Sequence, residues 1–558
     1  MATLAMVLAA CGSEGGDTAA DDETPNREGR LIYGEGTAFP ENLMPLIAAG
    51  NSVATGNIIG RILPAPFIIQ PDFTVAYDEA LLTSEPTSER EGDGQTVVYE
   101  LNPDAVWSDG TDITADDFEF TWQLQRSSDP ADGGCPALLS TTGFDQIGSV
   151  EGSEDGKTVT VTYDTPYPDW KSIFTLFPAH LLDTGDPAEN CAMVTEGWPT
   201  ANGIPEDISG GPWQLQGDRV DAGSQVLSLV PNPEWYGEGP FLEALIYQTI
   251  GDESNVVVSA MQSGEIDLVN PQPQLDLVGQ IQDLEPNVES SIDFGLSFEH
   301  FDLNTANVHL AKPEVREAFA LALDREAIVA ATVGAFDSRA QVLNNRFYVN
   351  NQPEYEDTAP EEFSTQDVPG AIAMLESVGY TIGADGVAVH PQDGRLALTM
   401  STTQNNPLRE DTIDLASAQV AQAGFAIEKF LDPDIFAGAD RPTSLEARGF
   451  DIALFAWVSS PFVSGNVSLY QSDGGQNYAG VSNEEVDALL ELLSTEIDPD
   501  ESARLANEAD AILWEEMATI PLYQKPSFTA WSSEFDNIEP NATLAGPLWN
   551  AKEIALAG

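Results

Sequence analysis

Segments with the two-residue period of β-strands alternate along this chain with segments that have the 3.6-residue period of helices. The chain has 558 residues and shows no repeat of 20–50 residues, so we expect an α/β protein of several lobes with a ligand site in a cleft between them. The clearest strand patterns lie at 96–101, 150–163 (around a hairpin turn at 153–156) and 227–230. The clearest helix patterns lie at 254–264, 313–334, 368–379, 411–424, 483–493 and 501–517.

The charge of the chain excludes some partners without naming a ligand. Asp and Glu number 92 against 21 Lys and Arg, a formal net charge of −71, while 42% of the residues are hydrophobic. So much apolar material excludes wholesale disorder. The missing basic surface excludes nucleic acid as a partner and argues against docking on an anionic membrane through basic residues. The acidity is compatible with an ordinary soluble surface or with a source living in salt.

The first residues indicate that the protein is exported from the cytoplasm. Residues 1–11 (MATLAMVLAAC) run from apolar to small residues just before Cys11, which resembles the lipobox of a bacterial lipoprotein signal. The basic start of a secretory signal is absent from this stretch, and the stretch is too short to span a bilayer. Residues 12–26 are small, polar and acidic, as a flexible tether should be. We expect lipidation of Cys11 and anchoring to the outer face of the cytoplasmic membrane; the alternative is a chance Ala-Ala-Cys.

The other two cysteines, Cys135 and Cys191, predict one disulfide in an exported protein. They lie 56 residues apart, and closing such a loop contributes about 3–4 kcal/mol. The alternative is two free buried thiols. Two cysteines this far apart make no zinc site, and the four histidines show no paired ligand spacing, so we expect no metal.

No motif in the sequence specifies catalysis or a cofactor. Residues 152–158 (GSEDGKT) resemble a phosphate loop, but only three residues separate the glycines, the segment reads as a hairpin, and its two acids would repel phosphate. No G-x-S-x-G nucleophile elbow is present, which disfavours a hydrolase, and acids are too common for any pair of them to be informative. We therefore expect a protein that is not an enzyme and that needs no cofactor.

A series of short segments, in order along the chain, resembles the extracellular family 5 solute-binding proteins of ABC importers, which include oligopeptide-, dipeptide- and nickel-binding members. The resemblance covers roughly residues 30–550. Its first motif is expected to be structural, because Asp109-Gly110 suits a tight turn and Thr114 can cap a helix with Asp117 as a capping-box partner. The segments are W-S-D-G-T at 107–111 with T-A-D-D-F at 114–118, S-G-G-P-W at 209–213, P-N-P-E-W-Y at 231–236, S-G-E-I-D at 263–267, and further matches within 313–325, 450–457 and 477–487.

The resemblance implies a two-lobed, periplasmic-binding-protein-like α/β fold (type II, or Venus flytrap) with an additional β-rich domain. Lobe I would comprise 27–60, 197–300 and 522–558, the extra domain 61–196, and lobe II 301–521. The lobes would close by hinge motion on an oligopeptide or similar solute and deliver it to a membrane permease with its ATPase subunits. We expect a monomer.

The resemblance also implies the ligand-binding residues. One ligand-facing stretch should be Ala49, Gly50 and Asn51, and the other the run Ala456, Trp457, Val458, Ser459 and Ser460, with Asn477, Tyr478 and Tyr523 as walls. Such proteins hold a peptide as an added strand through main-chain hydrogen bonds. Three of the residues have structural alternatives: Trp457 as plain core, Asn477 as a turn former and Tyr523 as buried packing.

One position departs from the family pattern. Oligopeptide binders carry an aspartate three residues after this tryptophan, where it pairs with the peptide α-ammonium, but here the position is Ser460. Because an unpaired buried charge is costly, either another acid such as Asp473 substitutes, or the ligand lacks a free amine there. The apolar neighbours Leu454 and Phe455 make a more apolar ligand plausible. The alternatives to a peptide importer are a receptor for a non-peptide solute and a lipoprotein of the same fold that acts as a regulator or scaffold in envelope assembly.

Overall fold

The computed structural model describes residues 27–92 and 94–558. The expected signal, Cys11 and the tether lie outside the described residues.

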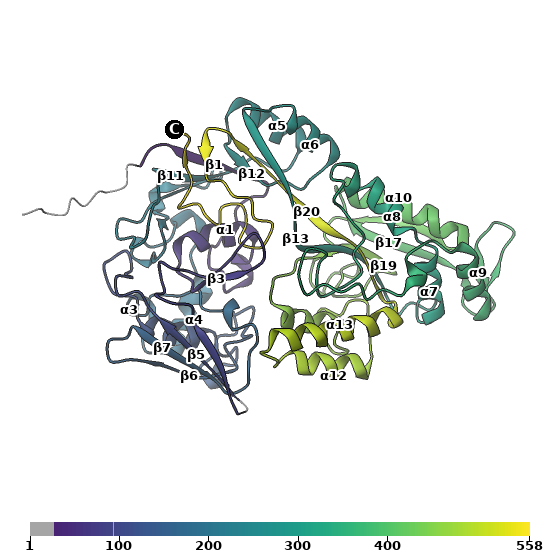
Figure 1. Ribbon diagram of the computed structural model, residues 1–558, viewed down its shortest axis with the longest axis horizontal. Helices are drawn as coiled ribbons and strands as arrows, with labels where there is room; N and C mark the ends of the chain where they lie inside the picture. Colours follow the sequence, from purple (N-terminus) through teal and green to yellow (C-terminus); the bar gives the residue numbers. More distant parts are fainter. Residues whose placement is uncertain (1–26, 93) are drawn as a thin grey trace, which may run out of the picture.

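One continuous eleven-stranded sheet runs through both lobes (Figure 1). Its two central strands, β13 (Val288–Leu303) and β20 (Thr519–Ser532), pair antiparallel and cross from one lobe to the other. The boundaries expected at 300/301 and 521/522 fall inside these strands, so the lobes share them. In lobe I, β20 is followed by β12 (Leu268–Val269), β1 (Arg30–Glu35), β11 (Ala244–Thr249), β10 (Val226–Pro231) and β8 (Trp213–Gln214), and β9 (Val220–Asp221) pairs with β10. In lobe II, β13 is followed by β19 (Ile452–Trp457), β17 (Ala397–Thr403) and β18 (Ala426–Asp432).

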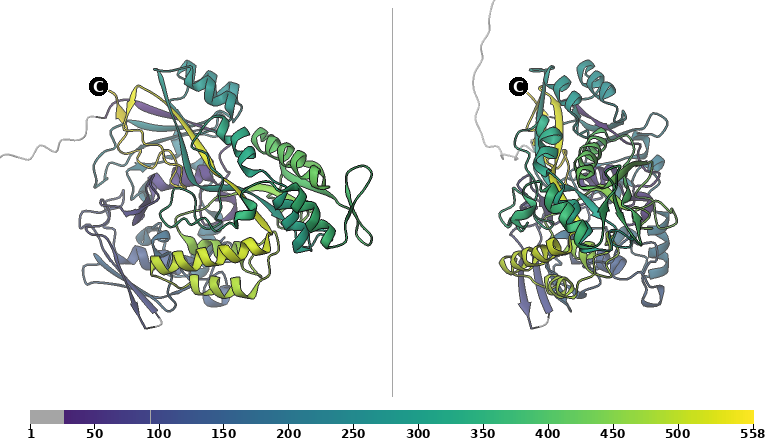
Figure 2. Two further views of the ribbon diagram at one scale, coloured as in Figure 1. Left: turned by 45° about the vertical axis from the view of Figure 1, so that its right-hand side comes forward. Right: turned by 90° about the vertical axis from the view of Figure 1, so that its right-hand side faces the viewer.

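The helices form where local capping signals allow. The pattern at 313–334 predicts one helix, but the structure has α7 (Pro313–Leu321) and α8 (Arg325–Ala331), because the Asp324 side chain accepts a hydrogen bond from the Ala327 N–H and starts a new helix. Helices α12 (Glu484–Leu493) and α13 (Pro499–Glu516) lie side by side (Figures 1 and 2). The remaining helices of the two lobes are α1 (Val53–Ile62), α5 (Ser254–Ser263), α6 (Leu275–Gln282), α9 (Val368–Ser377), α10 (Pro407–Val420) and α11 (Val467–Tyr470).

A separate four-stranded sheet lies within 61–196, and its order is β4 (Thr87–Glu91), β5 (Gly94–Glu100), β7 (Thr158–Tyr163), β6 (Ile147–Gly152). Helix α2 (Ala115–Gln125) packs on this sheet and begins with the capping box expected from the sequence. Asp117 Oδ2 accepts the Thr114 N–H at 2.9 Å and the Trp107 indole N–H at 3.2 Å, so the first family motif has a structural role. Smaller elements are α3 (Ala179–Leu182), α4 (Pro187–Glu196), β2 (Phe67–Ile69), β3 (Val75–Tyr77), β14 (Thr381–Ile382), β15 (Ala388–His390), β16 (Gly394–Arg395), β21 (Phe535–Asp536) and β22 (Ala555–Leu556).

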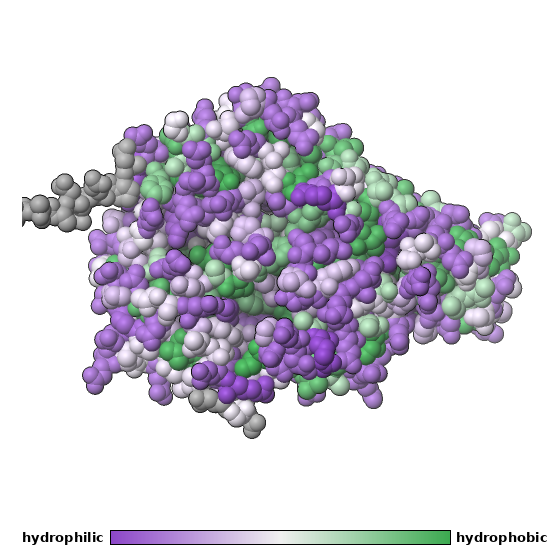
Figure 3. All heavy atoms as spheres, viewed as in Figure 1, coloured by the Kyte–Doolittle hydropathy of each residue, from purple (hydrophilic) through white to green (hydrophobic). Residues whose placement is uncertain are grey.

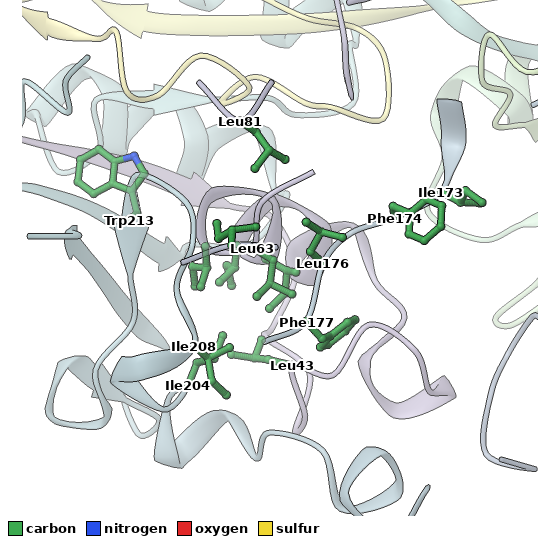
Figure 4. Close-up of a cluster of buried hydrophobic side chains, with 14 of the residues drawn as sticks. Leu43, Leu63, Leu81, Ile173, Phe174, Leu176, Phe177, Ile204, Ile208 and Trp213 are labelled. Atoms are coloured by element: carbon green, nitrogen blue, oxygen red, sulfur yellow. The ribbon is translucent and has the colours of Figure 1, made fainter. Parts of the chain in front are cut away.

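The extra sheet and lobe I share one hydrophobic core. Leu43 of the first segment, Leu176 and Phe177 of the extra domain, and Ile208 and Trp213 of the next segment belong to a single buried cluster (Figure 4). Beside it, a disulfide joins Cys135 to Cys191 of α4, with their Cα atoms 5.1 Å apart. Segments 27–60, 61–196 and 197–300 are thus packed into one body.

Candidate functional site

A cavity of about 500 Å³ is lined by residues from both lobes, a size typical of small-molecule sites. Its walls come from β1, the start of α1, β13, β20, the segment 541–547 and the residues that follow β19. The register of β13 against β20 shifts between Phe294 and Phe298, and the intervening Gly295 and Ser297 line the cavity. Such irregularities in a strand often lie beside binding sites.

The cavity rim is apolar. Val53, Val458 and Leu544 all line it, and they are 72%, 62% and 55% exposed. Apolar residues gather in the hollow between the two halves of the face shown in Figure 3. Large exposed apolar side chains around one cleft indicate a surface that a ligand or partner covers.

The first expected stretch reaches the cavity through Asn51. Gly50 is buried in the 3₁₀ turn Ala48–Gly50, and a Cβ there would lie 2.0 Å from the carbonyl oxygen of Met44, so this position requires glycine. Ser52 then caps α1 by accepting the Thr55 N–H at 3.1 Å. Asn51 lines the cavity, whereas Ala49 is exposed and Gly50 supports the turn.

The second expected stretch contributes Val458 and Ser459 to the cavity. Ala456 and Trp457 belong to β19 and are half-buried, and Ser460 Oγ accepts the Phe462 N–H. The Trp457 ring stacks with His300, at a centroid distance of 5.8 Å, and with Tyr478, at 5.6 Å. The described contacts of Trp457 are therefore packing contacts that hold the end of β19.

The expected wall residues do not line the cavity. Asn477 forms a turn, because its Nδ2 donates to the carbonyls of Gln471 and Val481 and its Oδ1 accepts two backbone N–H groups. Tyr478 stacks on Trp457, and Tyr523 is fully buried in the core of lobe II. These placements match the structural alternatives for Asn477 and Tyr523.

Two charged residues that sequence reasoning missed face the cavity. Glu35, at the end of β1, is 8% exposed, and its Oε1 accepts the Gly36 N–H at 3.1 Å. Its Oε2 has no hydrogen-bond partner among the described residues. Burial raises the pKa of Glu35, against the lowering effect of the Thr37 and Gly36 backbone N–H groups and of the Thr37 hydroxyl.

Lys525 of β20 is half-buried and lines the same cavity. Burial lowers the pKa of its ammonium, while the nearby Glu299 carboxylate raises it. That carboxylate is already bound by Arg409, whose Nε and Nη2 donate to it over 3.0–3.1 Å. The available signal was a lysine within the apolar run I-P-L-Y-Q-K-P-S-F of a chain in which lysine is scarce.

The substitute acid considered from the sequence, Asp473, is exposed and lies outside the cavity lining. Within residues 27–92 and 94–558, no group of three or more His, Cys, Asp or Glu side chains is placed to hold a metal ion. In the same ranges no helix is both long and apolar enough to cross a membrane.

Apart from the cavity, a hydrogen bond joins the extra domain to lobe II. The Ser464 hydroxyl donates to Asp169 Oδ2, and Asp169 is 6% exposed. Burial raises the pKa of Asp169 to about 6, although the Ser464 hydroxyl and the N–H groups of Gly465 and Ser464 act in the opposite direction.

Comparison with known proteins gives consistent matches. Residues 77–479 match the family model described as bacterial extracellular solute-binding proteins, family 5. The oligopeptide-binding protein OppA of Mycobacterium tuberculosis is 28% identical over 515 residues, which cover 90% of this chain and 81% of OppA. An uncharacterized lipoprotein of the same organism is 24% identical over 530 residues, 87% of this chain and 86% of the lipoprotein. Among solved structures, the periplasmic EDTA-binding protein EppA superposes with a TM-score of 0.86 at 28% identity, covering 97% of this chain and 98% of EppA.

Proposed function

The chain belongs to the bacterial extracellular solute-binding proteins of family 5, and from this membership we propose that it binds a short peptide between its lobes and delivers it to an ABC permease. As a solute-binding protein it is a transport component and not an enzyme. The observation that carries the peptide assignment is the cavity itself, which Asn51 lines from one lobe and which Val458 and Ser459, directly after the end of β19, line from the other. A site at the end of a strand suits a ligand that adds to that strand through its own backbone.

The rest of the expected organisation belongs to the same proposal. The proposal keeps the two lobes and the extra domain expected from the sequence, but treats β13 and β20, which the expected boundaries cut, as hinge strands shared by both lobes. Cys11 carries the lipid anchor and residues 12–26 form the tether, so the ligand is captured outside the cytoplasmic membrane. The likeness to a mycobacterial lipoprotein supports this anchoring.

A polycarboxylate chelate is the second candidate, because EppA, named for binding EDTA, is similar to this chain over almost its whole length. The charges of the cavity favour the peptide. Lys525 is the one cationic side chain among the described residues that line it, and Glu35 contributes an unpaired carboxylate oxygen. Several ligand carboxylates would therefore face one countercharge and one repulsive group.

Native mass spectrometry of protein purified without refolding, followed by denaturing identification of the released species, tests the proposal. We expect short peptides, and we expect the emptied protein to rebind a pool of synthetic peptides in preference to EDTA. Ser459→Trp should fill the cavity and abolish peptide binding, while the exposed Ser377→Trp should not. Binding of EDTA with no binding of peptides would replace the peptide assignment by the chelate.

A further inference from the structure

We propose that Glu35 and Lys525 recognise opposite charges on one ligand, so that the cavity selects a short peptide with a free α-ammonium at Glu35 and a free carboxylate at Lys525. This inference rests on the proposed function and deepens it. It also names the acid that replaces the family aspartate missing at Ser460.

The Glu35 carboxylate is arranged to receive a cation. It is more than nine-tenths buried, it lines the cavity, and its Oε2 has no partner in the described part of the chain. A buried carboxylate oxygen without a hydrogen bond is costly. A ligand ammonium, which carries three donors, would remove that cost.

The Lys525 ammonium is arranged to receive an anion. No hydrogen bond or ion pair within 4.0 Å joins it to the described residues, and Glu299, the carboxylate that acts on it, is held by the Arg409 guanidinium. The Lys525 ammonium, the Arg409 guanidinium and the Glu299 carboxylate together carry one net positive charge. A carboxylate entering there would gain a charge-assisted hydrogen bond in a partly desolvated place.

The sheet register places the two groups on one face and too far apart to pair with each other. Tyr33 and Gly34 of β1 lie opposite Leu268 and Val269 of β12, and Val269 lies opposite Ala530 of β20. Continuing this register by one residue places Glu35 opposite Thr529 across β12. Thr529 is four residues from Lys525 on β20. Residues an even number apart on a strand point to the same side, so Glu35 and Lys525 lie on one face of the sheet. Two strand spacings of about 4.8 Å and four residue rises of about 3.4 Å separate the two Cα atoms by roughly 17 Å.

This separation sets the length of the ligand. The glutamate and lysine side chains shorten the gap from each end, and an extended peptide spans at most about 3.3–3.6 Å per residue. A chain of about two to four residues with both ends free fits between the two groups. Its side chains would contact the apolar rim at Val53, Val458 and Leu544.

The experiment compares a pool of synthetic tripeptides with free ends against the same pool N-acetylated and the same pool C-amidated. Binding to the emptied full-length protein is measured by equilibrium dialysis with mass spectrometry. We expect each blocked pool to bind at least about tenfold more weakly than the free pool, corresponding to about 1.4 kcal/mol or more. The Glu35→Gln variant should bind the free pool more weakly than the unchanged protein does, and acetylation should cause no further loss of binding. The Lys525→Met variant should also bind the free pool more weakly, and amidation should cause no further loss.

Glu41→Gln and Lys429→Met, which change charges outside the cavity lining, serve as matched controls and should behave as the unchanged protein. Circular dichroism and thermal unfolding of every variant exclude misfolding as the cause of a lost signal. If all three pools bind the unchanged protein equally, or if either variant keeps the full penalty for its own blocked end, the charge-pair inference is wrong while peptide binding stands. If no pool binds at all, the proposed peptide function fails and the inference fails with it.

Discussion

The buried carboxyl of Asp169, at the contact between the extra domain and lobe II, should make stability depend on pH. Burial raises the pKa of Asp169 from 3.8 to about 6. An acid whose pKa is raised on folding binds its proton more tightly in the native state. Its contribution to the free energy of unfolding is therefore greatest at low pH and is lost as the pH rises from the unfolded pKa to the folded one.

Asp169→Asn removes this dependence and keeps an oxygen that can accept the Ser464 hydroxyl. A shift of about two pKa units is worth about 3 kcal/mol. Above pH 7 the buried carboxylate is charged, so the variant should be more stable than the unchanged protein by about 3 kcal/mol. At pH 5 the native carboxyl is largely protonated, and the advantage should shrink to about 1.5 kcal/mol.

Urea unfolding at constant ionic strength, at pH values of about 5 to 8, measures both free energies. Asp104→Asn is the matched control, because Asp104 is exposed on the same domain and its variant should follow the unchanged protein at every pH. The reasoning is refuted if Asp169→Asn is the less stable protein at pH 8, or if its advantage is the same at both ends of the range.

Three further changes test the contacts that hold the fold. Replacing Cys135 and Cys191 together by serine should lower the free energy of unfolding in urea by about 4 kcal/mol through the freed loop, and a loss below about 1 kcal/mol would show that the disulfide constrains little. Thr114→Ala should cost about 1 kcal/mol in calorimetry through the lost cap, and an unchanged melting temperature would contradict that role. Glu299→Gln should cost about 3–5 kcal/mol, because it leaves the Arg409 guanidinium buried without its countercharge; wild-type stability in urea would mean that the pair contributes nothing.

Local signals in the sequence predicted local structure well. Thr114 and Asp117 predicted a capping box that is present, because a cap depends only on residues three positions apart. The helix pattern at 313–334 predicts one helix, since its apolar period continues past the break. The cap at Asp324 divides this segment into two helices, and the Asp324 side chain is itself a local signal for a helix start.

The site was harder to predict because it is assembled from distant segments. The stretches around Asn51 and Ser459 are expected from the family resemblance, and residues of both line the cavity. Glu35 and Lys525 meet the same cavity only through the pairing of β1 with β12 and of β12 with β20, and no local pattern carries that register. The domain boundaries are hard to predict for a similar reason, because they depend on strands that are shared. A cut at 300/301 or 521/522 divides a strand that belongs to both lobes.

The net charge of −71 and the charges in the cavity favour the same class of ligand. At physiological ionic strength the field of exposed charges decays over about 8 Å, so the surface acids act mainly on the approach of a ligand and little on a group already buried beside Lys525. A polycarboxylate would be repelled on approach and would then find one cationic side chain among the described residues of the lining. A peptide with free ends and uncharged side chains carries no net charge, is neither attracted nor repelled as a whole, and satisfies Glu35 and Lys525 at once. The acidic surface therefore disfavours anions on approach, and the two charges of the cavity then select the ligand by the positions of its ends.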